Sequence, residues 1–157
     1  MKKCISIIGA FLGTLVPACF AIKMQQDCIN RWKEQADKNN ALFLLMNQWV
    51  NIKLEGKKLA DFFIKKGFSR IAIYGIESVG MCLFKELKDS EIEIAYVIGT
   101  TVSTASLDIK IVSVEDYLPD VDVVVNTFPG EFNKVSSMLS EKLNCSIIAI
   151  EDILNEI

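Results

Sequence analysis

The chain has 157 residues, of which 51% are hydrophobic, and its formal net charge is −3 at pH 7. This acidic balance excludes a general nucleic-acid binder, which needs a basic face. The sequence contains no histidine, so Ser-His-Asp and Cys-His catalytic arrangements are excluded as well. The five cysteines show neither paired nor metal-type spacing, which indicates reduced thiols rather than a disulfide framework or a zinc site.

The first segment of the chain is a long apolar run. Residues 4–22 carry no charge, and their number is close to the ~20 residues with which a helix crosses a bilayer. They predict a single-pass membrane anchor over residues 1–22. Two alternatives are a cleaved signal peptide and a lipoprotein signal that ends at Cys19. The apolar core of a signal peptide is usually shorter, ~7–15 residues, which favours the anchor.

Residues 23–40 are polar and compatible with a helix, and they predict a stalk that leaves the membrane. This stretch holds more lysine and arginine than the residues before the anchor, so the positive-inside tendency predicts that the domain beyond it is cytoplasmic. The run Asp37-Lys38-Asn39-Asn40 is expected to break the helix and to cap the next one.

Two further helices are predicted within residues 41–67. The first, residues 41–54, has a broad apolar face, which we expect to pack against a sheet or, alternatively, against another copy of the chain in a homo-oligomer. The second, residues 59–66, is followed by Gly67, a residue type that is common just beyond the C-terminus of a helix.

From residue 68 to residue 157 the chain alternates apolar runs with amphipathic helical patterns. The predicted strands are 71–74, 92–98, 109–112, 121–125 and 146–150, and the predicted helices are 78–88, 131–143 and 151–157. Continuous apolar strands joined by helices indicate a parallel sheet that is covered on both faces. Right-handed crossovers then predict strand order 3-2-1-4-5, with a crevice between the first and fourth strands. The expected fold class is therefore a Rossmann-like α/β domain with a five-stranded parallel sheet.

The turn after the first predicted strand is typical of the start of a nucleotide-binding unit. Gly75 ends the strand and Gly80 opens the helix, whose N-terminus presents backbone N–H groups at the crevice. The alternative interpretation is that the two glycines only allow a tight turn and close helix packing. The residues expected to contact a ligand are Gly75, Ile76, Glu77, Ser78, Val79, Gly80, Thr100, Thr127 and Phe128.

The dinucleotide signature itself is incomplete. In G-x-G-x-x-G the middle glycine lets the backbone approach a pyrophosphate, but Glu77 occupies that position here. The acidic residue that holds a ribose hydroxyl belongs about 20 residues further on, where the chain has Gly99 and its neighbours instead. We therefore expect weak or no NAD(P)H binding. The sequence identifies no cofactor, metal ligand or catalytic residue.

Three stretches carry a resemblance to known proteins. They are Asn47-Gln48-Trp49 through Leu59, Ile71-Ala72-Ile73-Tyr74-Gly75, and Ile150-Glu151-Asp152-Ile153-Leu154. They resemble an uncharacterised family of membrane-anchored bacterial proteins, found chiefly in Firmicutes and often beside surface-polysaccharide genes. The five-strand part also resembles the Rossmann-like N-terminal domain of sugar O-acyltransferases. Relatives have an Ile-Asp-Lys/Arg-Asn run after the second strand, where this chain has Gly99-Thr100-Thr101.

The resemblance implies a membrane-tethered Rossmann-like module that binds a nucleotide or a nucleotide sugar, with a binding or regulatory role in cell-surface polysaccharide biosynthesis. Two alternatives stay open. One is an NAD(P)-dependent enzyme that modifies a nucleotide-linked sugar, and the other is a ligand-free domain that binds a partner protein.

Overall fold

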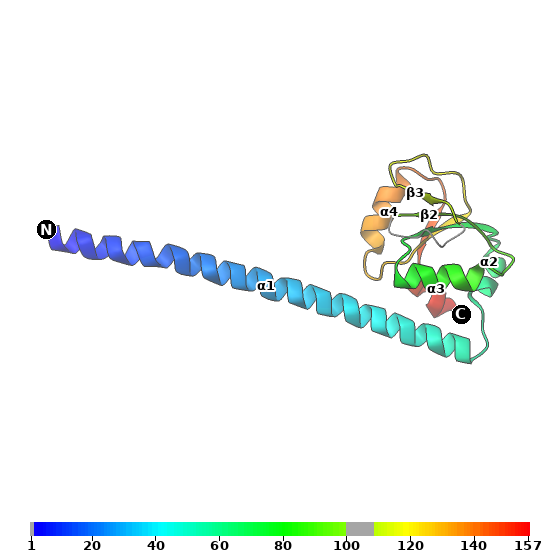
Figure 1. Ribbon diagram of the computed structural model, residues 1–157, viewed down its shortest axis with the longest axis horizontal. Helices are drawn as coiled ribbons and strands as arrows, with labels where there is room; N and C mark the ends of the chain where they lie inside the picture. Colours follow the sequence, from blue (N-terminus) through cyan, green and yellow to red (C-terminus); the bar gives the residue numbers. More distant parts are fainter. Residues whose placement is uncertain (1, 100–108) are drawn as a thin grey trace. The chain divides into compact units, whose positions relative to one another are not determined.

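The computed structural model describes residues 2–99 and 109–157, and it describes side chains from residue 23 onward (Figure 1). The chain divides into two compact units, Met1–Asn40 and Ala41–Ile157. The elements in chain order are α1 (Lys2–Leu54), α2 (Leu59–Lys66), β1 (Arg70–Tyr74), α3 (Ser78–Leu87), β2 (Glu93–Ile98), β3 (Ile111–Val112), β4 (Val123–Asn126), α4 (Phe132–Ser140), β5 (Ser146–Ala149) and α5 (Ile150–Glu156).

The first unit is the N-terminal part of α1. The helix break predicted at residues 37–40 is wrong, because α1 continues without interruption to Leu54. Side-chain pairs one turn apart support the helix here: Gln35 Nε2 donates to Asn39 Oδ1 at 3.0 Å, and Lys38 Nζ lies 3.2 Å from Glu34 Oε1. Each such pair stabilises a helix by about 0.2–0.5 kcal/mol, which is comparable to the low helix propensity of asparagine and aspartate.

The predicted stalk is helical, and every side chain from residue 23 to residue 40 is exposed to solvent. Within the part of the chain that the structure describes, no helix is both long enough and apolar enough to cross a membrane. The anchor predicted at residues 4–22 falls on residues whose side chains lie outside that description, so it stays a prediction.

The second unit contains a five-stranded parallel sheet in the order β3-β2-β1-β4-β5, as the sequence predicts. At the carboxyl end of β1, Tyr74 lies opposite Ile98 of β2 on one side and Asn126 of β4 on the other. The strand order reverses between β1 and β4. In open parallel sheets this reversal, at the carboxyl ends of the strands, is where ligands bind.

Helices cover both faces of the sheet, and Figure 1 shows α3 and α4 on opposite sides of it. One face packs against residues 41–54 of α1 and against α2, α3 and α5, with buried side chains that include Trp49, Phe63 and Leu83. The other face packs against α4, with a core that includes Tyr96 and Leu139. Two-sided burial explains why the strands are continuous apolar runs without alternation.

From α2 onward, the elements start and end within three residues of their predicted bounds. Gly67 ends α2 as expected: its φ is 76°, its N–H donates to Ile64 O at 3.0 Å, and the next N–H donates to Phe63 O at 2.9 Å. Pro129 precedes α4 and does not lie in its first turn. Gly130, with φ of 75°, separates the proline from the helix start at Phe132.

Candidate ligand site

The turn after β1 depends on Gly75. Its φ of 90° lies in the left-handed region that favours glycine, and its N–H donates to Ile98 O of β2 at 2.9 Å. A Cβ placed on Gly75 would lie 2.5 Å from Cε2 of Phe128, so the Phe128 ring covers this residue closely. The turn is therefore shaped by both neighbouring strands, since Phe128 belongs to the loop after β4.

Helix α3 begins directly against this turn because residue 80 is glycine. A Cβ on Gly80 would lie 2.1 Å from the carbonyl oxygen of Gly75, which is backbone and cannot easily move away. The first helical residue, Ser78, is exposed, and so is Glu77, whose side chain makes no capping hydrogen bond. The N–H groups of a first helical turn have no acceptor within the helix, and the helix dipole favours an anion there.

The loop after β4 is held by its own polar side chains. The buried Asn126 accepts from Phe128 N at 3.2 Å through Oδ1 and donates to Phe128 O at 3.1 Å through Nδ2. Thr127 is also buried, and its hydroxyl donates to the carbonyl oxygens of Tyr74 and Gly75, at 2.9 and 3.1 Å. Thr127 thus ties this loop to the glycine turn, and a ligand would find its hydroxyl already hydrogen-bonded.

Phe128 also contacts Tyr74, which limits how much of its ring is exposed to a ligand. Its ring meets the ring of Tyr74 edge to face, with centroids 5.8 Å apart and an interplanar angle of 73°. Burial, followed by the charge of Glu131, raises the pKa of Tyr74, so its phenol is neutral at physiological pH. Phe128 is only partly exposed, because its ring contacts Tyr74 and lies close to Gly75.

The structure brings together the two loops that the sequence assigns to the crevice. Glu77 and Ser78 are exposed, Ile76 and Phe128 are partly buried, Gly75, Val79, Gly80 and Thr127 are buried, and Thr100 lies outside the described residues. The ligand contacts proposed for these residues stay predictions. Among those of them that the structure describes, only Glu77 and Ser78 are exposed.

Sequence reasoning missed one carboxylate beside these loops. Glu151 follows β5 at the same edge of the sheet, and its Oε1 accepts from Gly130 N at 3.2 Å. Its Oε2 is buried and has no hydrogen-bond partner among the residues that the structure describes. The signal in the sequence is that Glu151 directly follows an apolar strand, as crevice residues do in a parallel sheet.

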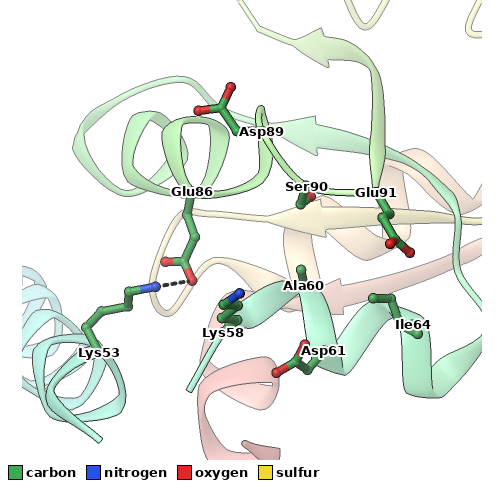
Figure 2. A pocket seen from close by; sticks show the side chains of 9 residues that line it. All are labelled: Lys53, Lys58, Ala60, Asp61, Ile64, Glu86, Asp89, Ser90 and Glu91. Carbon is green, nitrogen blue, oxygen red and sulfur yellow. Dashed lines mark hydrogen bonds and ion pairs between the residues drawn. The ribbon is translucent and has the colours of Figure 1, made fainter. Parts of the chain in front are cut away.

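A separate cavity of about 570 Å³ lies at the opposite edge of the sheet, where the strands begin (Figure 2). It is lined by residues of α1, α2, α3 and the segment before β2, namely Lys53, Lys58, Ala60, Asp61, Ile64, Glu86, Asp89, Ser90 and Glu91. No sequence pattern indicates this cavity, because its lining combines two stretches of the chain, residues 53–64 and 86–91.

Glu86 is the most heavily bonded side chain of that cavity. It accepts from Trp49 Nε1 at 2.8 Å, from Lys53 Nζ at 2.8 Å and from the backbone N–H of Leu59 at 3.0 Å. Burial opposes ionisation of this carboxyl, but the bonds from Lys53, Leu59 and Trp49 outweigh burial and hold the pKa of Glu86 below its usual range. Glu86 therefore fastens α1, α2 and α3 together, and we assign it a structural role.

Comparisons of the chain with protein-family models, curated proteins and solved structures found no match. The resemblances described above therefore stay predictions, and the function is argued from the geometry of the crevice.

Proposed function

We propose that the protein is a membrane-tethered Rossmann-like module whose crevice between β1 and β4 binds a nucleotide or a nucleotide sugar. The observation that carries this proposal is the contact of Gly80 with the carbonyl oxygen of Gly75. It fixes the N-terminus of α3 at the point where the strand order reverses, which is where a parallel sheet binds its ligand.

The start of α3 supplies what a phosphate group needs. A phosphate accepts hydrogen bonds and is negatively charged, and the first turn of α3 offers backbone N–H groups at the positive end of the helix dipole. The exposed hydroxyl of Ser78 adds a donor at the same place. Two of the three glycine functions of a dinucleotide fold are present, since Gly75 makes the tight turn and Gly80 allows close packing of the helix.

The loop side of the crevice holds one candidate acceptor for a sugar hydroxyl, Glu151. The Oε2 atom of Glu151 is buried and lacks a hydrogen-bond partner within the described chain, and an unpaired carboxylate oxygen is costly in the folded protein. A sugar hydroxyl is a donor that would satisfy it. Glu151 stays close to the crevice through its bond to Gly130, which ends the Thr127-Phe128 loop.

Ordinary dinucleotide binding is disfavoured by two side chains. Glu77 stands where the backbone would have to meet a pyrophosphate, and Phe128 covers Gly75. A mononucleotide or nucleotide sugar can use the start of α3 without crossing that turn. We therefore propose a binding or regulatory role in preference to an NAD(P)-dependent enzyme.

The proposed setting is the cell membrane, with the second unit in the cytoplasm. The tether rests on the uncharged run of residues 4–22, and the cytoplasmic placement rests on the basic residues that follow it. The link to surface polysaccharide assembly rests on the resemblance stated in the sequence analysis.

A ligand-free partner-binding domain is the second candidate. It is favoured by the same Phe128 contact that disfavours a dinucleotide, because a ring packed on Gly75 and Tyr74 fills part of the crevice floor.

A thermal-shift screen separates the two candidates. The chain from Asp37 onward would be heated with nucleotides, nucleotide sugars and acyl-CoA in turn. A ligand at 100 times its dissociation constant adds about 2.7 kcal/mol to the free energy of unfolding. Stabilisation by a nucleotide or nucleotide sugar supports the proposal. A screen in which none of these compounds changes the melting temperature favours the partner-binding domain.

A further inference from the structure

Helix α1 carries an apolar repeat with a period of seven residues. Ile29, Ala36, Phe43 and Val50 follow one another at this interval, and all four side chains are exposed. A seven-residue apolar repeat on a helix is the pattern with which two helices pair along their length. The first two residues belong to the first unit and the last two to the second unit.

In the second unit, the repeat lies opposite the face of α1 that packs on the domain. Leu45, Trp49 and Ile52 are buried in the core. At 3.6 residues per turn, Phe43, Val50 and Leu54 lie on the other side of the helix. Phe43 is 62% exposed, Val50 52% and Leu54 80%. The domain therefore uses one face of this stretch and leaves a second apolar face uncovered.

In the first unit, most charged side chains lie on the side of the helix away from the repeat, and Lys33 is the exception. Ile29 is 52% exposed and Trp32 is 73% exposed, and together with Ala36 they form one side of the helix. The charged residues Asp27, Arg31, Glu34 and Lys38 recur at the same helical spacing on the opposite side. Helices in water gain most of their stability from packing of an apolar face, so this stretch is expected to have a partner.

We infer that each of these two stretches pairs with the same stretch of a second copy, so that the protein is a parallel homodimer joined along α1. The two copies present identical faces, which is the requirement for a two-fold symmetric interface. Asn40 and Asn47, both exposed, interrupt the apolar face one turn after Ala36 and Phe43. An asparagine amide both donates and accepts, so each can pair with its own counterpart only when the helices are parallel and in register.

The polar flanks of the repeat favour a second copy over the surface of a membrane. Exposed Lys33 takes the same position in the seven-residue repeat as Asn40 and Asn47, and exposed Asn51 lies beside Val50, so only a narrow apolar stripe is left. Helices that lie on a membrane have a broad apolar face with lysine and arginine around it. None of the residues of the repeat lies in the ligand crevice, so the dimer is independent of the proposed function.

Disulfide trapping in the full-length protein, in lysates of cells that express it, tests this inference. In a parent chain with Cys4, Cys19 and Cys28 changed to serine, Val50→Cys places a thiol on the repeat. Leu44→Cys is the matched control, since Leu44 is 58% exposed against 52% for Val50 but lies beside the repeat. A disulfide needs the two Cα atoms within about 7 Å of each other. Mild oxidation should give a covalent dimer for Val50→Cys, and little for Leu44→Cys or the parent.

Charge substitutions give a second readout that needs no added cysteine. In detergent-extracted full-length protein, Ile29→Glu combined with Val50→Glu should halve the mass measured by sedimentation. Met24→Glu combined with Leu44→Glu, which changes exposed apolar residues outside the repeat, should leave the mass at two chains. A wild-type mass of one chain would overturn the inference. So would equal cross-linking of the Val50→Cys and Leu44→Cys chains.

Discussion

The carbonyl oxygen of Gly75 lies 2.1 Å from the point where a Cβ at position 80 would be built, so the turn after β1 and the first turn of α3 are in direct backbone contact. Thr127, in the loop after β4, binds the same carbonyl group: its hydroxyl donates to Gly75 O at 3.1 Å. The N-terminus of α3, the end of β1 and the loop after β4 therefore form one connected structure. Substitutions in any of the three are expected to affect both stability and ligand binding.

Gly80→Ala should destabilise the second unit. The new methyl group would collide with the Gly75 backbone, and overpacking of this kind typically costs about 1–3 kcal/mol. This cost exceeds the gain of up to ~1 kcal/mol in helix propensity from glycine to alanine. Urea unfolding of the chain from Asp37 onward measures the difference. Gly99→Ala is the control, since a Cβ there meets nothing within 4 Å, and it should change stability by less than about 0.5 kcal/mol.

Thr127→Val should cost about 1 kcal/mol, and up to about 3 kcal/mol if a buried carbonyl is left without a donor. Valine keeps the shape of threonine but lacks the hydroxyl that bonds to Tyr74 and Gly75. Thr127→Ser keeps the hydroxyl and should unfold at a higher urea concentration than Thr127→Val. The opposite order would mean that the methyl group, and not the hydrogen bond, holds the loop.

Glu86→Gln should lower the free energy of unfolding by about 1–3 kcal/mol at pH 7, because a glutamine NH2 group would face one of the three donors that Glu86 now accepts from. The folded pKa of Glu86 is lowered relative to the unfolded value of about 4.3. The stabilisation by this carboxylate is thus fully present above pH ~4.3 and is lost as the pH falls through the folded pKa.

Urea unfolding between pH 3 and pH 7 checks the Glu86 prediction. The difference between wild type and Glu86→Gln should be largest near neutral pH and should shrink in acid. Asp122 has a lowered pKa too, through backbone hydrogen bonds from Arg70 and Ser69, but both chains share it and its effect cancels in the comparison. If the difference in unfolding free energy between the two chains stayed constant down to pH 3, the ionised carboxylate of Glu86 would not be the source of the stabilisation.

The burial of Tyr96 predicts that the folded protein loses stability in alkali. Burial is the main cause that raises the pKa of Tyr96 to about 12, and its hydroxyl donates to Pro119 O at 2.7 Å. Since an unfolded tyrosine has a pKa of about 10, the stabilisation is present below pH ~10 and disappears as the pH rises toward 12. Tyr96→Phe should be less stable than wild type at pH 8 by about 1 kcal/mol, and this gap in the urea midpoint should close above pH ~10.

The sequence was sufficient to predict the sheet. The β-branched run at β4 and the apolar runs at β1 and β2 have no alternation, which indicates burial on both faces, and right-handed crossovers leave few possible strand orders. The roles of Gly75 and Gly80 in a tight turn and close packing were also predicted, because only glycine fits where a side chain has no room.

The side-chain hydrogen bonds of the site and between the helices could not be predicted, because they join residues that are far apart in the sequence. The bond between Thr127 and Gly75 joins residues 52 positions apart, and the bond between Trp49 and Glu86 joins residues 37 positions apart. No periodicity in the sequence encodes such pairs. The helix break at 37–40 was predicted from residue types that favour caps, but in α1 the Gln35–Asn39 side-chain bond lets the helix continue.

Calorimetry with Ser78→Pro decides whether the first turn of α3 holds the phosphate of a nucleotide or nucleotide sugar. Proline is well tolerated at the first position of a helix but has neither the N–H nor the hydroxyl of serine, so this variant removes both donors of Ser78 from the crevice and keeps α3. Ser78→Ala removes only the hydroxyl, and Ser146→Ala changes an exposed residue where β5 begins, at the opposite edge of the sheet.

For the best compound from the thermal-shift screen, we predict that Ser78→Pro weakens binding at least tenfold, which corresponds to about 1.4 kcal/mol. We predict a smaller loss for Ser78→Ala and none for Ser146→Ala. Unchanged affinity in Ser78→Pro would show that the ligand does not bind at the start of α3, and would contradict the claim.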